Sequence, residues 1–159
     1  MYGLRKDIWP RKPTPTDAQL EDVLKKAVWS PLDSTKVAIT ARIDPSPAFP
    51  NASRFSFAID PAGVDFQQED GKYRGQVDVL FVQQRKGGEY AAELKKTLTI
   101  AVTPERYKVL RANGVILTED LRIHPDTVAV RIIVVDRSSG STGSVTVVVG
   151  AEDKSGANG

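Results

Sequence analysis

The chain has 159 residues, of which 40% are hydrophobic and 26% charged, and its 22 basic and 20 acidic side chains give a net charge of +2. Because cysteine is absent and histidine occurs once, disulfides, thiolate metal sites and multi-histidine metal sites within one chain are excluded. The balanced charge argues against nucleic-acid binding, and no apolar run approaches the roughly 20 residues of a membrane span. One globular domain is the expected organisation.

Residues 1–15 are predicted to form an extended linker, rich in basic residues and proline. A helix follows, because Thr16 and Gln19 have the spacing of a capping box. Ser30-Pro31 is predicted to end it, with Trp29 as its hydrophobic anchor, and we expect it to pack on a sheet edge. Its apolar residues recur at helical intervals: Leu20, Val23, Leu24, Ala27 and Val28.

From Asp33 onward the apolar period changes from helical to two, which predicts strands. Turn signals at Asp60–Gly63, Asp70-Gly71 and Arg85–Gly88 separate them. A short helix is expected to interrupt the strands, with Thr103 as its cap, Pro104 in its first turn and Asn113-Gly114 at its end. The strands predicted up to that point and just beyond are Val37–Ile43, Phe55–Ile59, Val64–Phe66, Tyr73–Gln84, Ala91–Val102 and Val115–Ile123.

The stretch Val128–Val149 is predicted to be a β-hairpin that closes the domain. Two runs rich in β-branched residues flank a Ser/Gly loop, and the first run is aliphatic on one side and nearly so on the other. That pattern is typical of an inner strand in a stack of two sheets.

These elements together predict an all-β fold: an immunoglobulin-like β-sandwich of about seven or eight strands, with a leading N-terminal helix and one short helix between strands. The domain is expected to span residues 16–150, followed by a flexible polar tail over residues 151–159.

Three polar groups invite a chemical interpretation, and for each a structural one is favoured. Asp136–Ser141 resembles a cation-binding Asp-x-Ser-x-Ser loop, but its fifth residue is Gly140, so a polar hairpin loop is expected. The acidic residues between Asp60 and Asp70 lack calcium-loop spacing. A hydrolase could use only Asp60, Asp136 and His124, and only if the fold brings them together. We therefore predict a non-enzymatic chain with no catalytic residue, no metal and no cofactor.

Exposed aromatic side chains are the remaining candidates for recognition. Tyr73 and Tyr90, with Trp9 and Phe49, could form a platform on which sugars stack, although packing within the domain is the favoured interpretation of each.

Several segments resemble the C-terminal β-rich region of bacterial, acidobacterial-type VWFA-related proteins, in which a von Willebrand A domain precedes this region. They are Tyr2–Trp9, the Leu20–Leu32 helix ending in Ser30-Pro31-Leu32, Phe57–Pro61, Gly75–Val79, Thr103–Leu110 with Asn113–Val115, Val130–Asp136, and Gly140 with Gly143–Val145. The chain departs from the family in having His124-Pro125-Asp126 where a Pro-Gly turn is usual, and it lacks the A domain. The resemblance implies a secreted or cell-envelope location and no transferable cation site.

The resulting hypothesis is a non-catalytic interaction or scaffold module of a larger exported bacterial protein. Its partner would be another protein or the missing N-terminal von Willebrand A domain, with no nucleic acid and no membrane span. The alternative is a carbohydrate-binding β-sandwich module that uses Tyr73 or Tyr90.

Overall fold

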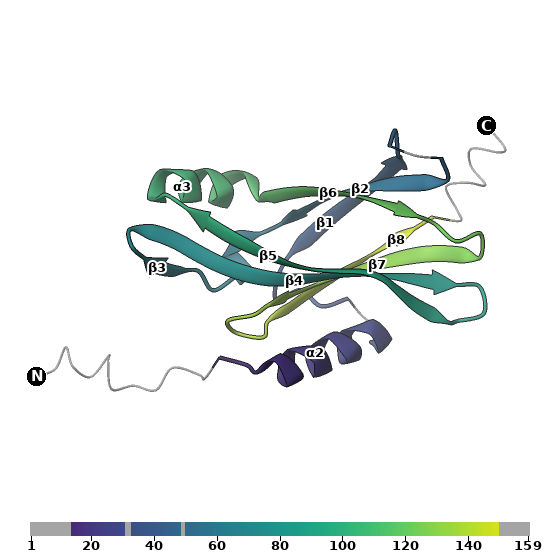
Figure 1. Cartoon of the computed structure of the whole chain (residues 1–159), viewed down its shortest axis with the longest axis horizontal. Helices are drawn as coiled ribbons and strands as arrows, with labels where there is room; N and C mark the ends of the chain where they lie inside the picture. The colour runs from purple at the N-terminus through teal and green to yellow at the C-terminus, as the bar shows by residue number, and fades with distance from the viewer. Residues whose placement is uncertain (1–13, 31–32, 49, 150–159) are drawn as a thin grey trace, which may run out of the picture.

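The structure is a computed structural model that describes residues 14–30, 33–48 and 50–149. Over these residues the chain forms three layers: a helix, a larger antiparallel sheet and a smaller antiparallel sheet (Figure 1). The predicted linker and tail, apart from Thr14 and Pro15, lie outside the described residues, as do Trp9, Pro31 and Phe49. In chain order the elements are α2 (Asp17–Trp29), β1 (Ile39–Pro45), β2 (Ala52–Ile59), the 3-10 turn η1 (Pro61–Gly63), β3 (Gln67–Glu69), β4 (Lys72–Arg85), β5 (Tyr90–Val102), α3 (Pro104–Asn113), β6 (Val115–Arg122), β7 (Thr127–Asp136) and β8 (Thr142–Val148).

The strand order confirms the predicted immunoglobulin-like sandwich. One sheet has the order β1-β2-β6 and the other the order β5-β4-β7-β8. These orders correspond to strands A-B-E and C′-C-F-G of the immunoglobulin-like fold. Strand β3 is an addition: it pairs with the first residues of β4, on the edge of β4 that β7 occupies farther along.

The main core lies between the two sheets. Phe81 of β4 meets Phe55 and Phe57 of β2 edge to face, with ring centroids 5.8 and 5.5 Å apart. Alternate residues of β7 (Val130, Ile132 and Val134) complete this core and are fully buried. Alternate residues of these strands are apolar because one face of each strand points into the sandwich.

The outer face of the larger sheet is apolar as well, and α2 covers it. Leu20, Leu24 and Ala27 of the helix pack on Leu80 and Val82 of β4 and on Ile133 and Val135 of β7. The expectation that α2 packs on a sheet edge is therefore wrong, because the helix lies on the outer face of the larger sheet (Figure 1). A face with four large aliphatic side chains needs a cover, and an edge contact would leave most of that face in water.

Two further expectations need correction. Trp29 does not anchor the end of α2, since 67% of its surface is exposed.

Residues Val64–Phe66 are not a strand; β3 begins at Gln67, because Arg137 and β7 bond to Gln76 and the following residues of β4 and occupy the edge that a longer β3 would need. Phe66 is free to turn its ring onto Tyr107 of α3 instead.

The local end signals behave as predicted. Thr16 and Gln19 form the capping box of α2. Thr103 caps α3, and Gly114 ends that helix at φ +82° with its N–H donating to the Leu110 carbonyl at 2.7 Å.

A short extended segment before β1 ties the two sheets together. Ser34 and Val37 exchange backbone hydrogen bonds with Ser144 and Thr142 at the start of β8, and the chain then enters the smaller sheet as β1. Gly143 lies directly under this crossing, where a Cβ atom would come within 1.9 Å of the Val37 carbonyl oxygen.

The substitution Gly143→Ala should therefore destabilise the domain by about 1–3 kcal/mol, since the crossing segment has to move. Gly87→Ala is a matched control, because its new Cβ would meet nothing nearer than Glu89 Oε1 at 3.6 Å, and it should stay within about 0.5 kcal/mol. Urea unfolding midpoints measure both effects, and equal midpoints would contradict the close approach.

Candidate functional site

The most developed polar arrangement in the described residues holds α2 onto the larger sheet. Arg131, Ile133, Val135 and Arg137 alternate along β7 and just beyond it, so their side chains share the face that α2 covers. Two aliphatic side chains thus lie between two guanidinium groups. We call the contacts of these two arginines with α2 the α2 clamp.

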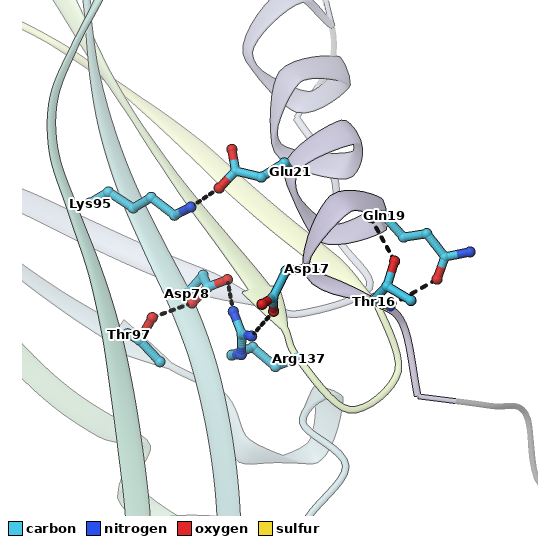
Figure 2. Close-up of polar contacts among 8 residues, drawn as sticks. All are labelled: Thr16, Asp17, Gln19, Glu21, Asp78, Lys95, Thr97 and Arg137. Atoms are coloured by element: carbon cyan, nitrogen blue, oxygen red, sulfur yellow. Dashed lines mark hydrogen bonds and ion pairs between the residues drawn. The ribbon is translucent and has the colours of Figure 1, made fainter.

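Arg137 holds the N-terminal end of the helix. Its guanidinium donates to Asp17 Oδ1 at 2.6 Å and to Asp78 Oδ2 at 2.7 Å (Figure 2). The hydrogen bond with Asp17 is the main reason that the pKa of Arg137 is raised above its ordinary value, and Asp78 adds to it. The arginine therefore stays charged and bridges helix and sheet.

Asp78 is buried beneath the same end of the helix, with 1% of its surface exposed. A buried carboxylate is costly unless it is paired, and Asp78 is paired twice: the Thr97 hydroxyl donates to Oδ1 at 2.6 Å and Arg137 donates to Oδ2. Lys95 and Glu21 form a second, more exposed ion pair between β5 and α2 (Figure 2).

Arg131 holds the C-terminal end of the helix. Its buried guanidinium donates to the carbonyl oxygens of Ala27 and Ser30 at 2.9 and 2.5 Å, and Asp33 lies 3.6 Å away. The last carbonyls of a helix have no partner within the helix, and its C-terminus carries a partial negative charge. The buried Arg131 guanidinium therefore supplies both the donors that these carbonyls lack and the positive charge that this end of the helix favours.

The spacing of the two arginines matches the helix. Six residues of strand span about 20 Å, and the 13 residues of α2 span about 20 Å as a helix. Because Asp17 meets Arg137 and Ser30 meets Arg131, α2 runs antiparallel to β7.

The tip of the β7–β8 hairpin is a self-contained polar loop. The buried Asp136 carboxylate accepts from the Asp65 and Ser138 backbone N–H groups at 3.0 and 3.2 Å and from the Ser139 hydroxyl at 2.6 Å. The Ser138 hydroxyl in turn donates to Asp65 at 3.0 Å. The carboxylate therefore fixes the turn and the strand next to it, as a loop with an Asx turn does.

A hollow of about 450 Å³ lies between this loop and the start of α2. Acidic and basic side chains both line it, and those of Arg137 and Asp65 are already engaged with protein partners. No group of three or more acidic, histidine or cysteine side chains in the described part of the chain could hold a metal ion.

Tyr73, the first predicted recognition residue, lies in an aromatic cluster at the α3 end of the sandwich. Its ring stacks on Tyr107 with centroids 4.1 Å apart and planes 4° apart, and its hydroxyl accepts from Gln68 Nε2 at 2.8 Å. Its ring is thus already stacked within the domain.

Tyr90, the second, lies at the start of β5 beside α2. It pairs in register with Gln84 of β4, and its ring meets that of Trp29 at 4.7 Å between centroids. Tyr90 is half-buried, whereas 67% of Trp29 is exposed.

The fold does not combine the two tyrosines into one platform. Tyr73 points to the face between the sheets, together with Val77 and Phe81, whereas Tyr90 points to the α2 face. They also lie near opposite ends of the β4–β5 pair, since Tyr90 pairs with Gln84, which is eleven residues from Tyr73 along β4.

The three polar residues of the hydrolase hypothesis do not meet either. Asp136 is the last residue of β7 and His124 precedes its first, so the ten residues of the strand, roughly 30 Å, separate them. Asp60 lies near the Asp136 end, where its carboxylate accepts from the Ala62 N–H at 2.9 Å and caps η1. The fold therefore does not bring His124 to the two carboxylates.

His124 belongs to a polar plug at the other end of the sandwich. The buried Gln83 amide donates to the Arg122 carbonyl at 2.9 Å, and its oxygen accepts from the His124 N–H at 3.0 Å and from the Thr127 hydroxyl. A second hollow, of about 740 Å³, opens beside it between β1, β2 and the β6–β7 turn. The buried Gln83 amide thus joins β4 to the end of β6 and to the β6–β7 turn.

Comparison with known proteins returns no relative. The chain matches no protein-family model, no curated protein and no solved structure. Among the described residues, no helix is long and apolar enough to cross a membrane.

Sequence reasoning missed Arg131, Arg137 and Asp78. The available signal was the alternation Arg131-Ile133-Val135-Arg137, which places a charged residue at each end of an apolar strip about as long as the predicted helix.

Replacing Arg131 by methionine should cost roughly 2–4 kcal/mol, because several buried helix carbonyls lose their donor. Arg42→Met is the matched control: that arginine is exposed and pairs with Asp44 at 3.1 Å, so its loss should cost no more than about 1 kcal/mol. Urea unfolding compares the two variants, and a similar loss in both would contradict the clamp.

Acid titration should reveal the Arg54–Asp120 pair on the outer face of the smaller sheet. The hydrogen bonds from Arg54, 2.9 and 3.0 Å long, lower the pKa of Asp120 below its ordinary value of 3.8. A group with a depressed folded-state pKa stabilises fully above the unfolded value and loses that contribution as pH falls through the folded value.

The stability difference between the native chain and Asp120→Asn should therefore be constant above about pH 5 and shrink below pH 4. In an Arg54→Met background the same difference should lose most of its pH dependence. A difference that stays unchanged down to pH 2 in the native background would show that the pair does not depress the pKa.

Proposed function

We propose that the chain is a non-catalytic interaction or scaffold module of a larger exported bacterial protein of the VWFA-related kind. The observation that carries the proposal is the path of the chain through the sandwich. Pro15 lies beside Gly140 at the tip of the β7–β8 hairpin, whereas Val149 bonds to Val128 at the opposite end of β7. Entry and exit at opposite ends suit a module set in line between other segments.

The clamp supports the same proposal. Arg131 and Arg137 hold the two ends of the entry helix to the sandwich, and the buried Asp136 carboxylate shapes a loop. A module set in line needs an entry segment with one defined docked position, and the clamp gives α2 that position.

The resemblance to the VWFA-related C-terminal region suggests which partner this module contacts and where the protein is located. Under this proposal the preceding von Willebrand A domain is the neighbour, and the whole protein is exported. Loops and open sheet edges would then provide the contact surface.

The coding region upstream of Met1 tests this proposal first. We expect an in-frame von Willebrand A domain preceded by an export signal, and a frame without them would contradict it. With the A domain in hand, titration of the isotope-labelled module should shift resonances on one contiguous surface, whereas unchanged spectra at millimolar concentration would rule out a direct contact.

Carbohydrate binding is a second candidate, and the Trp29–Tyr90 pair is the observation that favours it. A largely exposed tryptophan against a tyrosine gives an apolar, aromatic surface that the described residues leave open.

A glycan array with the native chain, Trp29→Ala, Tyr90→Ala and Tyr73→Ala tests this candidate. Sugar binding that is lost in the first two variants and kept in Tyr73→Ala would support it, because Tyr73 lies in the separate α3 cluster. No retained sugar with the native chain would eliminate it.

A further inference from the structure

We infer that α2 is a releasable strap, which can leave the sheet while the two-sheet sandwich beneath it stays folded. The basis is that the described residues contain two separate buried apolar clusters. The first fills the space between the sheets, and the second lies only between α2 and the outer face of the larger sheet. They share no buried side chain.

The separation follows from strand alternation. Along β7, Val130, Ile132 and Val134 belong to the inter-sheet core, whereas Ile133 and Val135 belong to the α2 cluster. Removing the helix would uncover the second set and leave the packing of the first set intact. Contacts that are lost together in this way define a unit of local unfolding.

The two ends of the strap are unequal. At the N-terminal end, the Asp17 side chain is 88% exposed, and the Glu21 and Lys95 side chains are 51% and 40% exposed. At the C-terminal end, the Arg131 side chain is only 6% exposed and donates to several helix carbonyls. Water competes with the first set of contacts and hardly with the second, so opening starts at Asp17.

A fixed point limits how far the strap can open. Ser34 donates through its N–H to Ser144 Oγ at 2.8 Å and through its hydroxyl to the Thr142 carbonyl at 2.7 Å, and Val37 bonds to Thr142 as well. The segment that follows α2 is thereby stitched to β8. Release thus ends before Ser34, and β1 keeps its place in the smaller sheet.

The open state exposes a defined surface. Leu80, Val82, Ile133 and Val135 would form an apolar strip with Asp78 at one end and Arg131, the cross-strand neighbour of Val82, at the other. This inference does not depend on the proposed function, since it concerns only the stability of α2 relative to the sandwich.

Single-cysteine labelling tests the inference, because the native chain has no cysteine. Val135→Cys places a thiol under α2 and Val134→Cys places one between the sheets; both valines are fully buried and adjacent in sequence. In native buffer we expect a thiol reagent to label Val135→Cys at least tenfold faster than Val134→Cys. Adding Arg137→Gln should speed the first reaction several-fold and leave the second unchanged.

Equal labelling rates for the two cysteines would overturn the inference, since they would show one cooperative unit. Hydrogen exchange of the unmodified chain provides the second measurement and needs no substitution. Amides of α2 should exchange at least tenfold faster than those of β4 and β7, with a weaker dependence on urea. A common exchange rate with a common urea dependence would equally overturn it.

Discussion

The structure depends on one constraint: strand β7 is apolar on both faces and has to be covered on both. Its even-numbered aliphatic residues meet the smaller sheet, and its odd-numbered ones meet α2. A sandwich of two sheets alone would leave Ile133 and Val135 in water, at a cost of about 1.5–3 kcal/mol for each side chain. The leading helix is therefore the third layer that this strand requires.

Arg131 and Arg137 fix how the helix lies on the apolar face of the sheet. An apolar strip by itself would accept a helix in either direction and in several registers. Arg131 selects the helix end that carries unpaired carbonyls, and Arg137 selects an acidic first turn, so both direction and register are fixed. The clamp thus links the fold to the proposed role, because it holds the entering chain in a set position against the sandwich.

Signals that act within a few residues could be read from the sequence. The capping box at Thr16, the Asp70-Gly71 turn, the Gly114 helix end and the closing hairpin all follow from local backbone chemistry. The clamp could not be read in this way, because Arg131 and the carbonyls of α2 meet only once the covered face of the sheet is known. Strand registers likewise decided that Tyr73 and Tyr90 face opposite sides, and that Gly143 lies under Val37.

The central claim is that a buried Arg131 guanidinium caps the C-terminal end of α2. The most direct test is nuclear magnetic resonance detection of scalar couplings across hydrogen bonds, from the side-chain nitrogens of Arg131 to the carbonyl carbons of Ala27 and Ser30. We predict that these couplings are observed and that the Arg131 side-chain N–H signals are protected from exchange with water. Absent couplings, together with rapid exchange of the Arg131 N–H signals, would contradict the clamp.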